Sequence, residues 1–509
     1  MPVRVPMRSL DDTDPISLAL APPQDESPDD RQKRILKERV AKQVSDEIDA
    51  QLNKERQQAK RQSKPVKILL LGQSESGKST TLKNFQLMCE PKAFRAERAS
   101  WRAIIQLNVI RSLRIILEAL AAASRSGDPP SPRSSYSSYS SRESIHPDSD
   151  LLSLRTRLLP LLEIEDALKR RLATPEADHL HEISSSSATP IPTISTIFRR
   201  RTNNEVVVNS SVAWQSAFMR GTDGRESFDT QNAVDWDAED DPGPALHARS
   251  EDMQRLWEHP TVRAILDQQG IRLQESPGFF LDELEVVTSL RYVPTDDHIL
   301  RARLKTLGVS EHRMHLTDPY NGITREFRFF DVGGQRSMVR FLAEHIISFE
   351  CANSEDKRAR WVPYFDDVEA IIFLAPISAF DQNLAEDRSV NRLADSVELW
   401  TAITSNQLLQ KTNIVLFLNK IDILQAKLAS GIRFADFLPT YGLRPNDYDS
   451  VSKYLRKQFN GIMKRSSPSP RIFYCHLTHV TDPKSTAYIL AGIKDMLMRS
   501  HLKESRLIL

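Results

Sequence analysis

The sequence of 509 residues is poor in cysteine and glycine and has no long apolar runs. Its three cysteines, Cys89, Cys351 and Cys475, are too few and too widely spaced for a disulfide framework or a four-cysteine zinc site, which favours a reducing, intracellular setting. No stretch approaches the roughly 18 apolar residues of a membrane-spanning helix, and residues 1–10 lack the apolar core of a signal peptide. We therefore expect a chain that neither spans a membrane nor is secreted.

Net charge and glycine content are also low. Lys and Arg number 69 and Asp and Glu number 68, so a general attraction to anionic polymers is absent and no nucleic acid binding is expected. Only 16 residues are glycine, about half of the usual share of roughly 7%, so each glycine cluster is more informative than usual. At roughly 150 residues per domain, the length predicts more than one domain.

Short apolar runs that alternate with helical patterns predict an α/β domain. The predicted buried parallel strands are Lys67–Leu71, Val368–Ala375, Asn413–Leu418 and Arg471–Cys475. Because helical patterns such as Asn391–Leu409 lie between them, we expect a parallel sheet covered on both faces. A turn-rich segment between His312–Leu316 and Arg325–Phe330 predicts a hairpin. This α/β domain is expected at 63–87 and 295–509.

The interval 88–294 predicts a helical domain inserted into the α/β domain. Its helical patterns are Trp101–Ala123, Met253–Gln269 and Phe279–Ser289. Polar, low-complexity stretches within about 122–250 predict disordered inserts, with a possible helix over Leu151–Leu172 that Pro160 interrupts.

The amino-terminal region divides into two parts. Residues 1–28 are rich in proline and predict a disordered leader, whereas residues 29–62 lack proline and glycine and predict a solvated helix. One face of that helix carries a narrow apolar stripe suited to a partner, made of Ile35, Leu36, Val40, Val44, Ile48 and Leu52. A charged helix that only links two parts of the chain is the alternative.

Gly72–Ser79 (GQSESGKS) matches the phosphate-binding pattern G-x-x-x-x-G-K-[ST] between a predicted strand and a predicted helix. The loop needs glycine where a Cβ would intrude on phosphate oxygens. Lys78 would neutralise the β- and γ-phosphates, and the Ser79 hydroxyl would bind Mg²⁺. The alternative is a glycine-containing turn without a ligand.

Two weaker motifs follow at the ends of other predicted strands. Asp331 could hold Mg²⁺ through water and Gly334 could bring a backbone N–H to a terminal phosphate, although Asp-x-x-Gly also forms ordinary turns. In Asn419–Asp422 (NKID), the carboxylate of Asp422 can accept both N1–H and the 2-amino group of guanine. The order of the three motifs, each at the carboxyl end of a predicted strand, places nucleotide binding where open α/β sheets bind ligands. Asn419–Asp422 favours guanine and disfavours an ATPase or kinase.

These motifs, together with Glu75-Ser76, Leu300–Gly308 and Thr478–Thr481, resemble heterotrimeric G-protein alpha subunits over about 29–120 and 250–509. The resemblance implies a P-loop, Ras-like GTPase domain with an inserted all-helical domain. It also implies a signal transducer that hydrolyses GTP to GDP and couples a receptor to effectors, with Mg²⁺ and GTP or GDP as ligands.

The resemblance also assigns individual residues. Arg303 would stabilise the transition state together with Lys78, Gln335 would orient the attacking water, and Glu75 would pair with Arg303. The metal ligands would be Ser79, Thr306 and, through water, Asp331. The nucleotide-binding residues would be Glu75, Ser76, Gly77, Lys78, Ser79, Thr80, Ser276, Leu300, Arg301, Thr306, Asp331, Gly334, Asn419, Lys420, Asp422 and Val480. Without the resemblance, Arg303 is better interpreted as part of a solvated basic loop.

The implied partners are a G-protein beta/gamma dimer, a seven-helix receptor and an unknown effector. Pro2 stands where myristoylation needs glycine, and no cysteine precedes Cys89, so the expected location is cytoplasmic and peripheral at the inner face of the plasma membrane through partners.

Three departures from the family pattern stand out. Gln73-Ser74 suggests a bulkier P-loop, His479-Val480 replaces smaller residues, and the apolar segment Met338–Ala343 replaces the charged switch II helix. Because switch II is altered, a nucleotide-loaded scaffold or poorly cycling GTPase is the alternative function.

Overall fold

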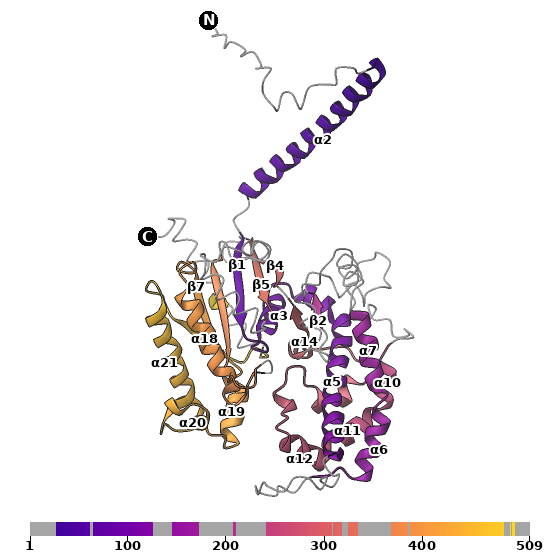
Figure 1. Cartoon of the computed structure of the whole chain (residues 1–509), viewed down its shortest axis with the longest axis vertical. Helices are drawn as coiled ribbons and strands as arrows, with labels where there is room; N and C mark the ends of the chain where they lie inside the picture. The colour runs from indigo at the N-terminus through magenta and orange to yellow at the C-terminus, as the bar shows by residue number, and fades with distance from the viewer. Residues whose placement is uncertain are drawn as a thin grey trace, which may run out of the picture. The chain divides into compact units, whose positions relative to one another are not determined.

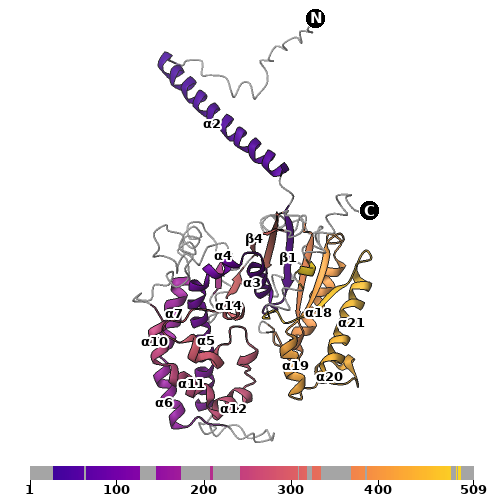
Figure 2. The ribbon, with the colours of Figure 1, turned by 180° about the vertical axis from the view of Figure 1, so that it is seen from behind.

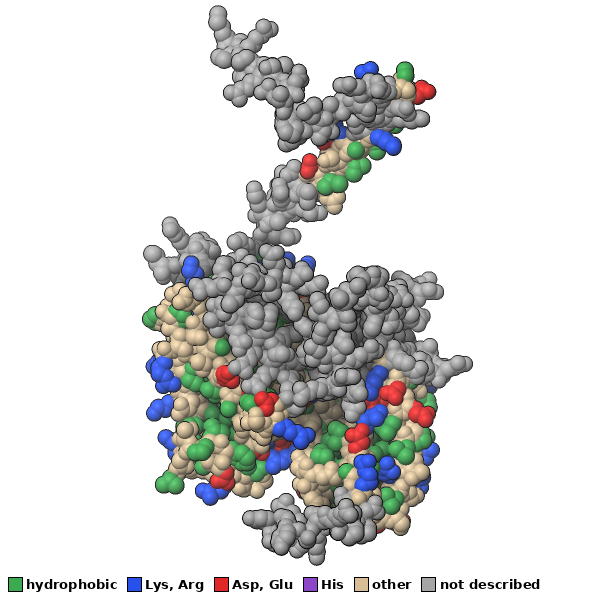
Figure 3. Space-filling view, in the orientation of Figure 1, with side chains coloured by type: hydrophobic (Ala, Val, Ile, Leu, Met, Phe, Trp, Pro, Cys, Tyr) green, Lys and Arg blue, Asp and Glu red, His purple; other side chains and the backbone are tan. Residues whose placement is uncertain are grey.

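The computed structural model describes residues 27–61, 65–125, 145–172, 207–209, 241–307, 309–317, 324–333, 368–384, 387–482, 489 and 491–493. The chain forms two compact units, Met1–Lys64 and Pro65–Leu509. The first contains helix α2 (Pro28–Arg61), and the leader before it lies outside the described residues. Ile35, Leu36, Val40, Val44 and Ile48 of α2 are exposed by 43% to 67%, and apolar side chains are visible among charged ones on this helix in Figure 3.

The second unit contains a six-stranded sheet with the order β4-β5-β1-β6-β7-β8. Its strands are β1 (Val66–Gly72), β4 (Val309–Thr317), β5 (Thr324–Val332), β6 (Ala370–Pro376), β7 (Asn413–Asn419) and β8 (Tyr474–Thr478). All neighbouring strands pair in parallel except β4 and β5, which are antiparallel as the predicted hairpin requires. The turn between these two strands lies outside the described residues.

The central strands β1, β6 and β7 are buried on both faces of the sheet, which explains why these three are continuous apolar runs. In β1, Leu69 and Leu71 belong to one core cluster with Trp400 and Phe459, whereas Ile68 and Leu70 belong to the cluster on the other face. The helices of this domain are α3 (Lys78–Cys89), η5 (Ile377–Asp381), α18 (Arg392–Ser405), α19 (Ile421–Ala429), α20 (Phe434–Phe437), η6 (Pro439–Tyr441) and α21 (Tyr448–Ser466).

A helical domain lies beside the sheet in both views of the molecule (Figures 1 and 2). Its helices are α4 (Pro91–Ala96), α5 (Arg98–Arg125), α6 (Ser149–Leu158), α7 (Leu161–Leu172), α10 (Gly243–Ala248), α11 (Ser250–Glu258), α12 (Pro260–Gln268), η3 (Leu273–Glu275), η4 (Leu281–Glu283), α13 (Leu284–Val287) and α14 (Asp296–Arg301). Helices α7 and α12 contact α5, and a single hydrophobic core joins them.

The predicted helix over Leu151–Leu172 that Pro160 interrupts is confirmed, whereas the disorder expected elsewhere over about 122–250 is wrong at Val207–Asn209 and Gly243–Ala248. Helices α6 and α7 form on either side of Leu159-Pro160, and Leu151, Leu154 and Leu158 are buried in the helical core. Their regular apolar spacing supplies enough buried surface to order the segment. Strand β2 (Val207–Asn209) pairs in parallel with β3 (Lys305–Leu307), and α10 is also ordered. Residues 126–144, 173–206 and 210–240 lie outside the described residues.

None of the described helices is long and apolar enough to cross a membrane.

Candidate functional site

The P-loop connects the end of β1 to α3 in a conformation that depends on glycine. Gly72 and Gly77 have φ angles of 144° and 102°, in the left-handed region. A Cβ on Gly77 would lie 2.4 Å from Asn419 Nδ2, and one on Gly72 would lie 2.4 Å from the carbonyl oxygen of Leu374. Side chains cannot be accommodated at either position. The two glycines allow the loop to lead directly into the amino end of α3. The backbone N–H groups and the helix dipole at that end favour an anion.

A cavity of about 420 Å³ opens at the carboxyl ends of the strands, between the sheet and the helical domain. This volume suits a nucleotide-sized ligand. The predicted site residues that line it are Glu75, Ser76, Gly77, Lys78, Ser79, Thr80, Ser276, Leu300, Arg301, Arg303, Asp331, Asn419, Lys420, Asp422 and Val480. Gly334 and Gln335 lie outside the described residues, and Thr306 lies in β3 with its side chain outside the description.

Lys78 and Ser76 give the cavity its anion-binding character. The Lys78 ammonium donates to the carbonyl oxygens of Gly72 and Gln73, at 2.8 and 2.7 Å, so it lies across the loop. Burial lowers the pKa of Lys78 to about 8, against the opposing effect of Asp331. The Ser76 hydroxyl is fully buried and has no hydrogen-bond partner in the part of the chain that the structure describes. Both groups can therefore donate to phosphate oxygens.

The residues at the predicted metal position fit Mg²⁺. Ser79 Oγ donates to Asp331 Oδ2 at 2.8 Å, so a hydroxyl and a carboxylate meet at one point of the cavity. Hard oxygen atoms are the ligands that Mg²⁺ prefers, usually completed by substrate phosphates and water. No group of three or more His, Cys, Asp or Glu side chains forms a metal site among the described residues. A cation here would therefore depend on hydroxyls and on the oxygens of a bound phosphate.

Glu75 and Arg303 form an ion pair across the cavity, as expected from the resemblance. Arg392 Nη1 approaches the other oxygen of Glu75 at 3.2 Å. Burial alone would raise the pKa of the Glu75 carboxyl, but the neighbouring Arg303, Arg392 and Lys420 cations outweigh it and lower the pKa to about 2. Glu75 therefore stays ionised and holds the Arg303 side chain close to the P-loop.

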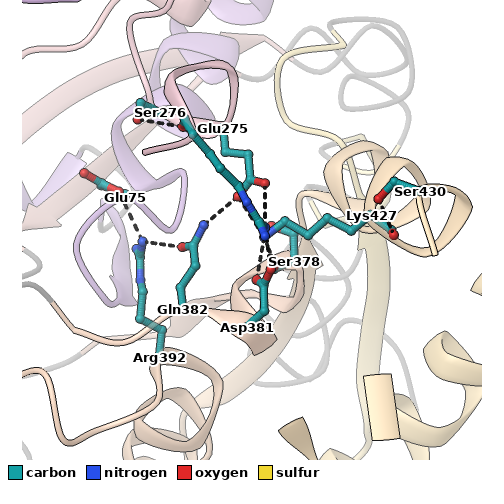
Figure 4. A network of polar contacts seen from close by, with 10 residues as sticks. Glu75, Glu275, Ser276, Ser378, Asp381, Gln382, Arg392, Lys427 and Ser430 are labelled. Atoms are coloured by element: carbon teal, nitrogen blue, oxygen red, sulfur yellow. Dashed lines mark hydrogen bonds and ion pairs between the residues drawn. The ribbon is translucent and has the colours of Figure 1, made fainter. Parts of the chain in front are cut away.

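A polar network continues from Arg392 to the helical domain (Figure 4). Arg392 donates to Gln382, and Gln382 donates to Glu275 at 2.7 Å. Lys427 bridges Glu275 and Asp381, at 2.7 and 2.5 Å, and Arg272 reaches Asp381 at 2.6 Å. Sequence reasoning missed this network because its members belong to no motif. It links the helical domain to the sheet at the rim of the cavity.

Asn419 organises the opposite end of the cavity. Its Nδ2 donates to the Ser76 carbonyl oxygen at 2.7 Å, and its Oδ1 accepts from the Thr478 hydroxyl at 3.1 Å. The same oxygen lies 3.4 Å from the backbone nitrogen of Val480. Asn419 therefore ties the ends of β7 and β8 to the P-loop. Burial lowers the pKa of the adjacent Lys420 to about 8.

Asp422 presents a carboxylate to the base end of the cavity. Its Oδ2 lies 3.2 Å from His479 Nε2, and its Oδ1 is buried without a hydrogen-bond partner among the described residues. Leaving a buried carboxylate oxygen unpaired costs free energy. A ligand that donates two hydrogen bonds to the Asp422 carboxylate would remove this cost. Guanine has this arrangement and adenine does not.

The remaining predicted residues from the helical side occupy the rim. Arg301 pairs with Glu283 and Asp297, each at 2.8 Å. The Leu300 carbonyl oxygen accepts from the Thr80 hydroxyl at 3.3 Å, which joins α14 to α3. Ser276 lines the cavity next to Glu275 of the polar network.

Gln73 does not enlarge the P-loop toward the cavity as its size suggested. The side chain is 3% exposed and donates to the Arg392 carbonyl oxygen at 2.8 Å and to the Asp395 carboxylate. It therefore lies against the start of α18, where it adds a contact between the loop and the sheet domain.

Comparison with known proteins agrees with this site. A sequence profile of the G-protein alpha subunit family matches residues 42–497. The guanine nucleotide-binding protein alpha-4 subunit of Mycosarcoma maydis is 30% identical, with 98% of this chain and 96% of that protein covered. The alpha-1 subunit of the same organism is 27% identical, with 91% and 96% covered. A guanine nucleotide-binding protein subunit alpha of Coprinellus congregatus is 26% identical, with 92% and 97% covered. The chain belongs to the G-protein alpha subunit family, with its Ras-like domain and inserted helical domain.

Proposed function

We propose that this chain is a guanine-nucleotide-dependent switch that hydrolyses GTP to GDP and phosphate. One observation carries the proposal: a single cavity joins the P-loop, the Ser79–Asp331 pair, Arg303 and the carboxylate of Asp422. The family supports guanine nucleotides as the ligand. The distribution of charge supports one orientation of the nucleotide, with its phosphates at the Lys78 end of the cavity and its base at the Asp422 end.

In the proposed reaction, water attacks the γ-phosphate while this chain's residues hold the phosphates and stabilise negative charge. Lys78, the Ser76 hydroxyl and the amino end of α3 bind the phosphate oxygens. Arg303 already lies beside the loop through its contact with Glu75, and its guanidinium stabilises the charge that develops as the bond breaks. A Mg²⁺ ion held by Ser79, Thr306 and, through water, Asp331 would neutralise phosphate charge when bound. Gln335 orients the water.

Single-turnover hydrolysis of GTP by the full chain tests these roles. Gln335→Leu and Arg303→Cys should each slow hydrolysis by at least about tenfold and leave GTP affinity within about twofold, because both residues act mainly in the transition state. Arg313→Cys is the matched control, since Arg313 is an exposed arginine of β4 that pairs with Glu311 away from the cavity. Unchanged hydrolysis in both test variants would favour the alternative, a nucleotide-loaded scaffold.

We also infer that the partners are a beta/gamma dimer, a seven-helix receptor and an effector, and that the protein lies in the cytoplasm and reaches the inner face of the plasma membrane through them. The exposed apolar stripe of α2 supports a protein partner. A triple variant with Leu36→Asn, Val40→Asn and Val44→Asn should no longer bind purified prenylated beta/gamma dimer. Its affinity for GTP should be unchanged.

The control for this test is Lys42→Asn with Asp49→Asn, which changes the opposite face of α2 without changing its net charge. Equal capture of beta/gamma by the apolar-stripe variant and the wild type would contradict the assignment of α2.

A further inference from the structure

Asn108, in the middle of α5, is bonded to the backbone of Arg303. Its Oδ1 accepts from the Arg303 N–H at 2.7 Å, and its Nδ2 donates to the Arg303 carbonyl oxygen at 3.0 Å. The side chain is 3% exposed. Both ends of one amide therefore contact one residue that is 195 positions away in the chain. A buried amide in such a position is expected to fix the local backbone, because leaving either group unpaired is costly.

The fit around this contact is close. Gly278, in the loop after η3, has a φ of +79°, and a Cβ on it would lie 2.6 Å from Asn108 Oδ1 and 3.0 Å from Arg303 Cβ. The backbone of this loop therefore packs directly against both Asn108 and Arg303. Helix α5 and the loop after η3 therefore both contact the segment between α14 and β3 that contains Arg303.

Arg303 needs this support because no regular element holds it. It lies between the end of α14 at Arg301 and the start of β3 at Lys305. A long side chain amplifies a change in backbone orientation, and a displacement of about 1 Å in a group that stabilises a transition state can slow a reaction by about a hundredfold. Glu75 restrains the guanidinium end, whereas Asn108 restrains the backbone end.

We propose that Asn108 is a positioning residue for GTP hydrolysis, which acts by holding the backbone of Arg303 so that the guanidinium reaches the γ-phosphate. The inference rests on the proposed function, in which Arg303 stabilises the transition state. Asn108 does not itself line the cavity, so its effect falls on the rate of hydrolysis and not on the affinity for GTP.

A double-mutant cycle in single-turnover GTP hydrolysis tests this role in the full chain. Asn108→Leu removes both hydrogen bonds and should slow hydrolysis by about five- to tenfold, with GTP affinity within about twofold. In the Arg303→Cys background the same substitution should change the rate by less than about twofold, because the side chain that Asn108 positions is gone. A purely structural role would slow both backgrounds equally.

Two further variants keep the test independent of folding. Asn108→Asp still accepts from the Arg303 N–H but cannot donate to its carbonyl oxygen, so an intermediate rate is expected. Gln106→Leu, two residues away on α5 and 1% exposed, is the control and should stay within about twofold of the wild-type rate. An equal effect of Asn108→Leu in both backgrounds, or no effect in the wild-type background, would overturn the inference. If Arg303→Cys alone leaves hydrolysis unchanged, the proposed function fails first, and the role of Asn108 fails with it.

Discussion

Replacing Glu75 by Gln should destabilise the folded chain measurably, because the carboxylate lies among three cations. Arg303 and Arg392 contact its two oxygens, and Lys420 adds to the positive field. The pKa of Glu75 falls from 4.5 to about 2, which corresponds to about 3 kcal/mol at about 1.4 kcal/mol for each tenfold change in the protonation equilibrium. The side chain keeps 27% of its surface exposed, so screening by solvent reduces the expected loss to about 2 kcal/mol.

The sign of the pH dependence follows from the lowered pKa. The contribution of Glu75 to stability is present above the ordinary pKa of 4.5 and is lost progressively as the pH falls from there toward 2. The difference between the wild type and Glu75→Gln should therefore be constant above about pH 5.5 and should fall to roughly half by pH 3.5.

Urea denaturation of the nucleotide-free chain at several pH values measures this difference, because a bound nucleotide would add its own free energy. Glu326→Gln is the matched control, since Glu326 pairs with Arg328 at 2.8 Å and has a similar exposure of 24%, but has one arginine partner on the surface of β5. The expected loss in free energy of unfolding for Glu326→Gln is below about 0.5 kcal/mol. Equal losses in the two variants, or a Glu75→Gln difference that does not change with pH, would refute the electrostatic reasoning.

Two other predictions concern the two ends of the cavity. Asp422→Asn should weaken binding of GDP and improve binding of xanthosine diphosphate, since xanthine has an acceptor where guanine has a donor. Undiminished GDP affinity with no gain for the xanthine nucleotide would show that Asp422 does not bind the base. Burial lowers the pKa of Lys78 to about 8, and bound phosphate should raise it, so nucleotide binding should take up protons near pH 8.5 and weaken as the pH rises from 7.5 to 9. Calorimetry in two buffers of different ionisation enthalpy measures the uptake, and an identical heat in both would contradict it.

The sheet and the P-loop could be predicted because their signals are local. Residues of a strand buried on both faces must nearly all be apolar, so Lys67–Leu71 and Asn413–Leu418 predicted β1 and β7 to within about two residues. The predicted strand Arg471–Cys475 starts later, at Tyr474, where pairing with β7 begins, and the Arg471 side chain donates to the Leu409 carbonyl oxygen. Gly72 and Gly77, at the spacing of the phosphate-binding pattern, predicted the loop because no other residue fits its backbone at these positions.

The supporting contacts could not be predicted, because they join segments that are distant in the sequence. Asn108, Arg392 and Lys427 belong to no motif, and their polar groups acquire a role only when folding brings them to Arg303, Glu75 and Glu275. Gln73 shows the same limit, since its size alone suggested a bulkier loop and only the position of Asp395 explains where the side chain goes. A motif specifies what contacts the ligand, and the fold specifies what holds the motif.

The charges around the cavity imply that nucleotide binding and folding are coupled. Lys78 is buried and Lys420 is half-buried, and burial lowers the pKa of each ammonium group to about 8, against the opposing effect of nearby carboxylates. Arg303 and Arg392 both contact the carboxylate of Glu75. A polyphosphate would add negative charge beside these cations, so the folded chain should bind it more strongly than the unfolded chain can. The resulting stabilisation grows with the ratio of nucleotide concentration to Kd. Nucleotide binding should therefore stabilise the folded chain.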